Sequence, residues 1–214
     1  MVSKKRKQVF LSVSFCFAMT AASAGVTAAY LSRSPGEVCN VITAGAVEGK
    51  LTEEQWDPEN GKNVYPGQSM DKDPVVENVG ENEAWVFLEV AVPVETIALV
   101  DDTTGRKTEK EKHELFSFQA DTDSWELLSH ETSESQGSYL YGYKNVVEPG
   151  EKTEPLFHTV ETVNYLEGEP DIGQDYGIHV TAGMIQNNMQ TTNLEQIYRE
   201  FLEQRKEDEK GGEE

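Results

Sequence analysis

Short runs of strand-forming residues alternate with turn signals through most of the chain after residue 35. The strongest run is Ala84–Val92, which is almost continuously apolar and therefore predicts a central strand. Pro93 is expected to end this strand or to mark a bulge, because proline has no N–H to donate to a ladder. The other runs rich in Val, Ile, Thr and aromatic residues are Val41–Leu51, Pro74–Val79, Leu115–Gln119, Trp125–Leu128, Ser138–Lys144, Pro155–Val160 and Tyr176–Ile185. Many short strands between turn signals favour a β-sandwich or barrel.

One of these runs carries a tyrosine at every second position, at Tyr139, Tyr141 and Tyr143. Alternate residues of a strand share a face, so the three rings are expected to pack in the core or on a sheet face, with a ligand platform as the alternative. Gly45 and Gly49 favour a bulge or a close backbone approach within the first run. The long polar segments Leu51–Met70 and Val100–Lys112 are expected to be surface loops.

Helical periodicity occurs at one place, near the C-terminus. Thr192 or Asn193 can cap a segment whose apolar residues follow an i, i+3, i+4, i+7, i+8 pattern, namely Leu194, Ile197, Tyr198, Phe201 and Leu202. This pattern predicts a helix over 191–205 whose apolar face packs on the sandwich, with partner binding as the alternative. Residues 206–214 are nearly all charged or glycine and are expected to form a disordered acidic tail.

The N-terminal segment has the pattern of a secretory signal. Four basic residues, Lys4–Lys7, precede an uncharged run that continues to Ser32 and ends in small residues. Val26 and Ala28 fit the −3 and −1 positions, which predicts a signal peptide over 1–28, cleavage between Ala28 and Ala29, and a secreted mature chain. The run also exceeds the ~20 apolar residues that span a bilayer, so an uncleaved anchor is the alternative.

Removal of this signal leaves a strongly acidic chain with one cysteine. The mature chain keeps 14 Lys and Arg residues against 39 Asp and Glu, a net charge of −25. A surface of this charge repels phosphate backbones, so nucleic acid is excluded as an expected partner. Cys16 lies in the signal, and Cys39 is then either a free thiol or an intermolecular link. The remaining residues suffice for one domain, expected over 29–190, without disulfides.

Signatures of catalysis and of cofactor binding are missing. His113-Glu114 begins like a metallopeptidase helix, but Ser117 stands where H-E-x-x-H requires the second histidine. We therefore expect neither an enzyme nor a cofactor-binding protein. Ca²⁺ is the one ion that paired carboxylates could hold, at Asp71 with Asp73, Asp101 with Asp102, and Asp121 with Asp123, although none of these pairs reproduces a calcium-binding loop.

Several short motifs carry a resemblance to a known family. The segment Gly25–Leu31 resembles the end of signal peptides that are cut by SipW-type signal peptidases of Gram-positive bacteria, in which Gly-x-Thr-small-Ala precedes an aromatic residue. Further matching segments are Asn40–Gly45, Val64–Gly67 with its Pro-Gly turn, Val75–Gly80 with its V-x-N-x-G strand end, and Ile178–Gln186 with its terminal A-x-x-I-Q. In this order and spacing they resemble the TasA and camelysin family of biofilm-matrix and cell-surface proteins.

The resemblance implies a jelly-roll-like β-sandwich and, for fibre-forming members, polymerisation by donor-strand exchange. The donor segment would begin at Ala29, Tyr30 and Leu31, because cleavage frees that end to pair with the sheet edge of another subunit. Pro35-Gly36 would shorten or kink this donor, and Cys39 has no counterpart in the family's fibre formers. We therefore expect a subunit of an extracellular fibre, which pairs with itself or with a paralogue. The alternatives are a camelysin-like surface metallopeptidase and a monomeric, membrane-anchored binding module.

Overall fold

The computed structural model describes residues 41–44, 47–57, 64–101, 103–166 and 176–211, with 207–211 described as backbone alone. The predicted signal peptide over 1–28, the cleavage site at Ala28 and Ala29, the donor residues Tyr30 and Leu31, and Cys39 lie outside these residues. The molecule described below is therefore the predicted sandwich and the C-terminal helix.

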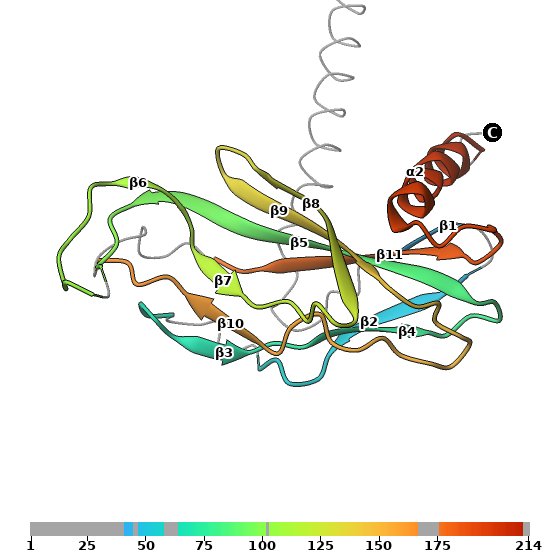
Figure 1. The fold of residues 1–214 in the computed structure, drawn as a ribbon, viewed down its shortest axis with the longest axis horizontal. Coiled ribbons are helices and arrows are strands. Elements are labelled where there is room, and N and C mark those ends of the chain that lie inside the picture. Colours follow the sequence, from blue (N-terminus) through green and yellow to red (C-terminus); the bar gives the residue numbers. More distant parts are fainter. Residues whose placement is uncertain (1–40, 45–46, 58–63, 102, 167–175, 212–214) are drawn as a thin grey trace, which may run out of the picture. The chain divides into compact units, whose positions relative to one another are not determined.

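The larger sheet has β5 at its centre (Figure 1). Its main path runs β1 (Val41–Ala44), β11 (His179–Gln186), β5 (Ala84–Ile97), β9 (Gln136–Tyr143) and β8 (Trp125–Thr132). A short strand, β6 (Glu111–Glu114), pairs with the distal end of β5. The prediction that the Ala84–Val92 run forms a central strand is confirmed. All strand pairs in the described part are antiparallel except β1 with β11, which run parallel.

A second layer faces this sheet. It contains β2 (Gly49–Glu53) with β4 (Pro74–Asn78), and β3 (Ser69–Asp71), β10 (Thr159–Thr162) and β7 (Phe116–Phe118). The segment that precedes β10 runs alongside β4 and so links these two groups of strands. Thr153 N of this segment donates a hydrogen bond to Val76 O of β4 (2.9 Å). Buried side chains from both layers form one core, among them Val86, Val90, Met184, Val76, Phe157 and Val160. The molecule is an all-β sandwich, as expected.

Pro93 does not end β5, contrary to the prediction. The strand continues to Ile97, and the carbonyl of Pro93 still accepts a hydrogen bond from Leu115 N (2.9 Å). The carbonyl of Leu115, which could have received an N–H from position 93, accepts Val163 N instead (3.0 Å). The absence of an N–H at Pro93 therefore leaves no carbonyl without a hydrogen bond, because the carbonyl of Leu115 already accepts Val163 N.

The first predicted strand, Val41–Leu51, is also corrected. It is two strands, of which β1 belongs to the larger sheet and β2 to the second layer. At Gly49 the chain passes so close to Met184 that a Cβ atom would collide with its sulfur. The close approach expected at Gly49 is therefore confirmed. It lies where the chain changes layer.

The segments predicted as loops contain short strands. β3 begins at Ser69, inside the first of them, and β6 begins at Glu111, inside the second. The strand predicted to end at Leu128 continues to Thr132 as β8. These additions are polar stretches whose strand conformation depends on pairing with a neighbour rather than on their own composition.

The C-terminal helix, α2 (Leu194–Gly211), packs on the outer face of the larger sheet, which confirms the predicted role of its apolar stripe. Asn193 caps it, because its side-chain oxygen accepts a hydrogen bond from Gln196 N (2.9 Å). Leu194, Ile197 and Phe201 are buried in a cluster with four sheet residues, which are Ala44, Trp85, Phe87 and Ile185. Among the described residues, no helix has the length and apolar character needed to span a membrane.

The expectation of a disordered tail from residue 206 is wrong as far as Gly211, because α2 continues to that residue. Residues 203–210 are Glu, Gln, Arg, Lys and Asp, most of which are good helix formers. Extension of a helix that is already anchored by packing adds one hydrogen bond per residue without a new nucleation step. The charge that indicated disorder is therefore compatible with a solvated helical end.

Candidate functional site

The edge of the larger sheet at β1 is the described element closest in sequence to the predicted donor segment. β1 has four residues and, among the described strands, pairs with β11 alone, and Ile42 is 36% exposed. Antiparallel neighbours can be joined by a tight hairpin, but a parallel pair cannot. β1 is therefore held by pairing and packing, without a hairpin to β11.

The opposite edge, β8, is protected against pairing with other chains. A bulge interrupts its register between Leu127 and Ser129, and its end carries the exposed residues Glu131 and Thr132. Bulges and edge charges are devices that discourage the addition of another strand. Leu127, at 49% exposed, is the large apolar side chain that this edge presents. Of the two edges, β1 is the less protected.

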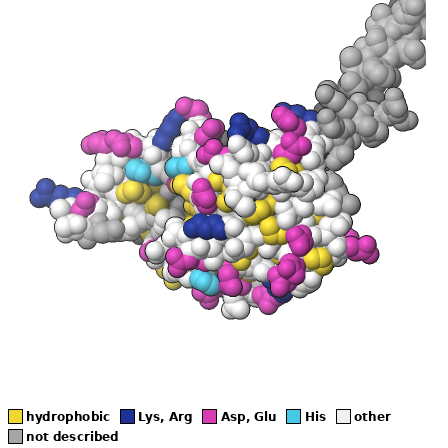
Figure 2. Space-filling model, turned by 45° about the vertical axis from the view of Figure 1, so that its right-hand side comes forward, with side chains coloured by type: hydrophobic (Ala, Val, Ile, Leu, Met, Phe, Trp, Pro, Cys, Tyr) yellow, Lys and Arg dark blue, Asp and Glu magenta, His cyan; other side chains and the backbone are white. Residues whose placement is uncertain are grey.

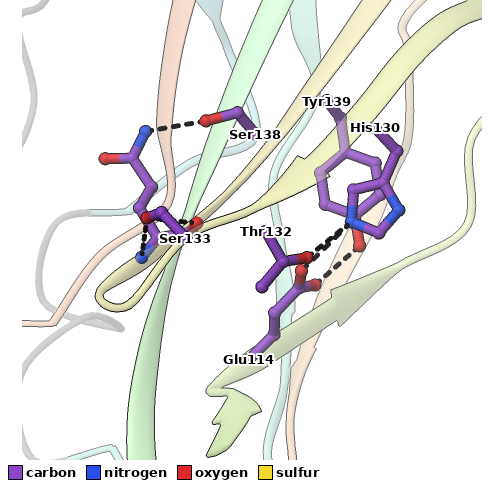
Figure 3. A network of polar contacts seen from close by, with 7 residues as sticks. Glu114, His130, Thr132, Ser133, Ser138 and Tyr139 are labelled. Carbon is purple, nitrogen blue, oxygen red and sulfur yellow. Dashed lines mark hydrogen bonds and ion pairs between the residues drawn. The ribbon is translucent and has the colours of Figure 1, made fainter.

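A polar network joins three strands at one end of the sandwich (Figure 3). Glu114 of β6 accepts a hydrogen bond from the hydroxyl of Tyr139 of β9 (2.6 Å), and its other oxygen lies 3.3 Å from Nε2 of His130 of β8. The His130 and Tyr139 rings stack, with centroids 4.0 Å apart and an interplanar angle of 9°. Thr132 Oγ1 lies 3.4 Å from the same histidine nitrogen. The network thus ties β6 to the β8–β9 pair.

The geometry of this network depends on a glycine. A Cβ atom on Gly137 would collide with the carboxylate of Glu114, so only glycine leaves room for that side chain. Burial raises the pKa of Tyr139 above its ordinary value, and the hydrogen bond to Glu114 raises this pKa further. Tyr139 therefore remains a neutral donor to Glu114 throughout the physiological pH range.

Replacing Tyr139 with Phe is expected to lower the free energy of unfolding by about 1 kcal/mol, because the Glu114 carboxylate loses its donor. The tyrosine also predicts a pH dependence. Its pKa is raised in the folded state, so stability falls as the pH rises above about 10, where the unfolded side chain ionises. In Tyr139→Phe, the part of the fall in the free energy of unfolding above about pH 10 that is due to this tyrosine should be absent, as measured by urea unfolding at several pH values. Tyr65→Phe, at a side chain that is 61% exposed, is the control, and equal behaviour of both variants would contradict the role of Tyr139.

The expected tyrosine stripe is a core feature. Tyr141 and Tyr143 are buried, and Tyr139 packs against the same core with partial burial. Phe118 lies edge-on to Tyr139 (5.2 Å between centroids), and Trp125 packs on Tyr143 (5.0 Å). The Phe118 contact packs across the two layers, the Trp125 contact joins neighbouring strands of the larger sheet, and both confirm the core interpretation.

His113-Glu114, the residue pair that begins a metallopeptidase motif, lies in β6 and not in a helix. Successive side chains of a strand point to opposite faces, so the two residues cannot act together as helical neighbours do. Glu114 belongs to the network with Tyr139, and His113 stands opposite Glu95 in the ladder with β5. The contact of Glu114 with Tyr139 is not predicted from the sequence.

One residue of each acidic pair that was considered for Ca²⁺ accepts hydrogen bonds within the protein, and Asp102 lies outside the described residues. Asp101 accepts hydrogen bonds from the backbone and hydroxyl of Thr104, which lower the pKa of this carboxyl. The Asp121 side chain accepts Asp123 N (3.0 Å), and its pKa is lowered chiefly by a hydrogen bond from Ser124. Asp73 accepts Gln55 N (2.7 Å). Within the described ranges, no three His, Cys, Asp or Glu side chains form a group suited to a metal ion.

The displayed face of the molecule carries many acidic side chains (Figure 2). Acidic side chains are spread over the displayed face rather than gathered in one patch, with some hydrophobic side chains exposed between them (Figure 2). A distribution of this kind provides solubility and mutual repulsion between copies. It does not define a binding site by itself.

Comparisons with known proteins add little to this description. No family model matches the chain, and no curated protein matches it. Among solved structures, the chain is similar to the ASH / PapD-like domain of human CEP192, with 12% sequence identity over 72% of this chain and 84% of that domain. The TM-score of 0.16 is too low for this similarity to carry an argument. The class is defined by the strand pairing and the two-layer core: an all-β sandwich with a C-terminal helix on one outer face.

Proposed function

We propose that the protein is a secreted structural protein, a subunit of a biofilm-matrix or cell-surface fibre that assembles by donor-strand exchange. In this scheme a signal peptidase cuts between Ala28 and Ala29, and the freed segment that starts Ala29-Tyr30-Leu31 pairs with a sheet edge of the next subunit. The backbone hydrogen bonds of an added strand supply affinity, and side-chain pockets supply specificity. The signal pattern and the family resemblance support the first part of the scheme.

The position of β1 is the observation that supports the second part of the scheme, the pairing of the freed segment with a sheet edge of the next subunit. The N-terminal part of the chain leads into a four-residue strand at a sheet edge, and this strand has no hairpin partner in the described residues. A segment that enters a fold in this way can pair with another copy without dismantling a hairpin. The β8 edge is protected by its bulge and charges, which leaves the β1 end of the larger sheet, where opening of β1 frees the edge of β11, as the favoured acceptor.

Deletion of residues 29–33 is expected to abolish assembly and leave the fold intact. Mature protein that begins at Ala29 should form fibres with increasing concentration, as followed by light scattering and electron microscopy, whereas the deleted variant should stay monomeric with an unchanged melting temperature. A variant with residues 29–33 replaced by Gly and Ser is the matched control for length, and should also fail. If the mature protein stays monomeric at all concentrations, the fibre proposal is wrong.

The same preparations separate the alternative functions. Cleavage of casein that stops on addition of a chelator would indicate the surface metallopeptidase. N-terminal sequencing of the protein in the medium should give Ala29 as the first residue. An intact Met1, found only in membranes, would indicate the anchored binding module.

A further inference from the structure

We propose that α2 is a clasp that holds β1 on the larger sheet and thereby limits exchange of the N-terminal part of the chain between copies. The clasp is a property of the fold. Its role in assembly rests on the proposed function, so the two are tested by separate measurements below.

Apart from its contacts with α2, β1 is bound only weakly to the rest of the described sandwich. In the described part of the chain it has four residues and pairs with one neighbour. Its side chains Val41 and Thr43 are partly buried, whereas Ile42 is exposed. Elements with few buried apolar contacts open more easily than the rest of a fold. Pairing with β11 alone therefore gives β1 little protection against opening.

Packing against α2 adds to the few contacts that hold β1 on the sheet. Ala44, the fully buried residue of β1, lies in the cluster formed by Leu194, Ile197 and Phe201 of α2. In Figure 1 the helix lies beside β1 and β11 at the same end of the sheet. The side of β1 that faces away from the main core is thus covered by α2.

A close approach brings α2 onto this edge. A Cβ atom on Gly183 would come within 2.9 Å of the Phe201 ring, so the ring rests directly on the β11 backbone. Gly183 is the register partner of Ile42. Phe201 therefore contacts the β1–β11 ladder two positions from Ala44, at a pair on the same face of the sheet.

The position of the anchoring residues within α2 bears on how the helix could release this edge. The residues that anchor the helix, from Leu194 to Leu202, all lie in its first half, and residues 203–211 are charged apart from Gln204 and the terminal glycine. A helix held by one apolar stripe, and not hydrogen-bonded into either sheet as a strand is, can detach as a unit while the sandwich remains folded. Detachment would uncover Ala44 and leave β1 with its ladder alone.

The proposal is tested by hydrogen exchange of Phe201→Ala, read separately at the β1 amides and at the β9 amides. In wild type the amides of β1 should exchange through an opening of lower free energy than those of β9, and removal of the ring should speed exchange in β1 by about tenfold or more. Phe201→Leu should give a smaller effect of the same kind. Glu203→Ala, at an exposed position of the same helix, is the control and should leave both strands unchanged.

Two results would overturn the clasp. One is unchanged exchange in β1 after both Phe201 substitutions. The other is an equal opening free energy for β1 and β9 in wild type, because α2, β1 and the rest of the sandwich would then open as one cooperative unit. Light scattering of mature protein tests the role in assembly, and Phe201→Leu should assemble faster than wild type. If wild type does not assemble while β1 responds as expected, the clasp stands and the proposed fibre function fails.

Discussion

Replacing Asn78 with Asp is expected to lower the free energy of unfolding by about 3–5 kcal/mol, the cost of an uncompensated charge in a protein interior. Asn78 is fully buried at the end of β4. Its amide nitrogen donates to the carbonyls of Asn82 (2.8 Å) and Val147 (2.9 Å), and its oxygen accepts Gly80 N (3.1 Å). A carboxylate would keep the acceptor and turn its second oxygen towards two carbonyl oxygens.

The pH dependence of this variant provides a further check. Burial and the facing carbonyls favour the neutral acid, so the folded-state pKa of the new Asp should lie above the ordinary value of ~3.9. The deficit in stability should then shrink as the pH falls towards 4 and grow as it rises. Urea unfolding followed by tryptophan fluorescence measures both effects. Asn188→Asp, at an exposed amide, is the control, and a loss below about 1 kcal/mol for Asn78→Asp would contradict the prediction.

Asn78 also gives a physical meaning to the V-x-N-x-G strand end on which part of the family resemblance rests. The asparagine closes the turn to Gly80 and fastens β4 to the segment around Val147. Both functions need an amide, with two donors and one acceptor, and cannot be performed by Asp or Ser. The motif therefore indicates a structural requirement of the sandwich and is not evidence for a binding site.

The fold could be predicted from the sequence where local pattern and tertiary burial agree. The Ala84–Val92 run and the apolar stripe of α2 are reliable signals. The apolar residues that produce the sequence pattern of each are also the residues that the fold buries. The separation of β1 from β2 could not be predicted, because both have strand composition and the change of layer near Gly49 depends on the approach of Met184. The continuation of β5 through Pro93 could not be predicted for a similar reason, since it depends on Leu115 and Val163, which are distant in the sequence.

The polar network was missed because nothing local marks it. Glu114, His130 and Tyr139 come from three strands, and each would be an ordinary surface or stripe residue if taken alone. Only the register of β8 with β9, together with the pairing of β6 with β5, brings them together. The one usable signal was Gly137, a glycine within an otherwise regular strand, which indicates the close approach of another group.

Replacing Gly183 with Val is expected to lower the free energy of unfolding by about 3 kcal/mol, at the upper end of what overpacking costs. The Cβ of the new side chain would lie 2.9 Å from Cζ and 3.1 Å from Cε1 of Phe201, and the β11 backbone beneath cannot retreat from the core. The ring must therefore leave its site, and the cluster around Phe87 and Ile185 loses its cover. The measurement is urea unfolding, together with near-ultraviolet circular dichroism of the aromatic cluster.

A double-mutant cycle with Phe201→Ala identifies the cause of this loss. Phe201→Ala alone should cost about 3–5 kcal/mol, as large buried aromatic side chains do on truncation. If Gly183→Val acts by expelling the ring, Phe201→Ala should cost about 1–2 kcal/mol less in the valine background than in wild type, because the two changes damage the same contact. Gly177→Val, at a glycine whose Cβ would meet no neighbouring atom, is the control for the effect of valine itself. Strictly additive losses would show that Gly183 is required by the strand and not by the docking of α2.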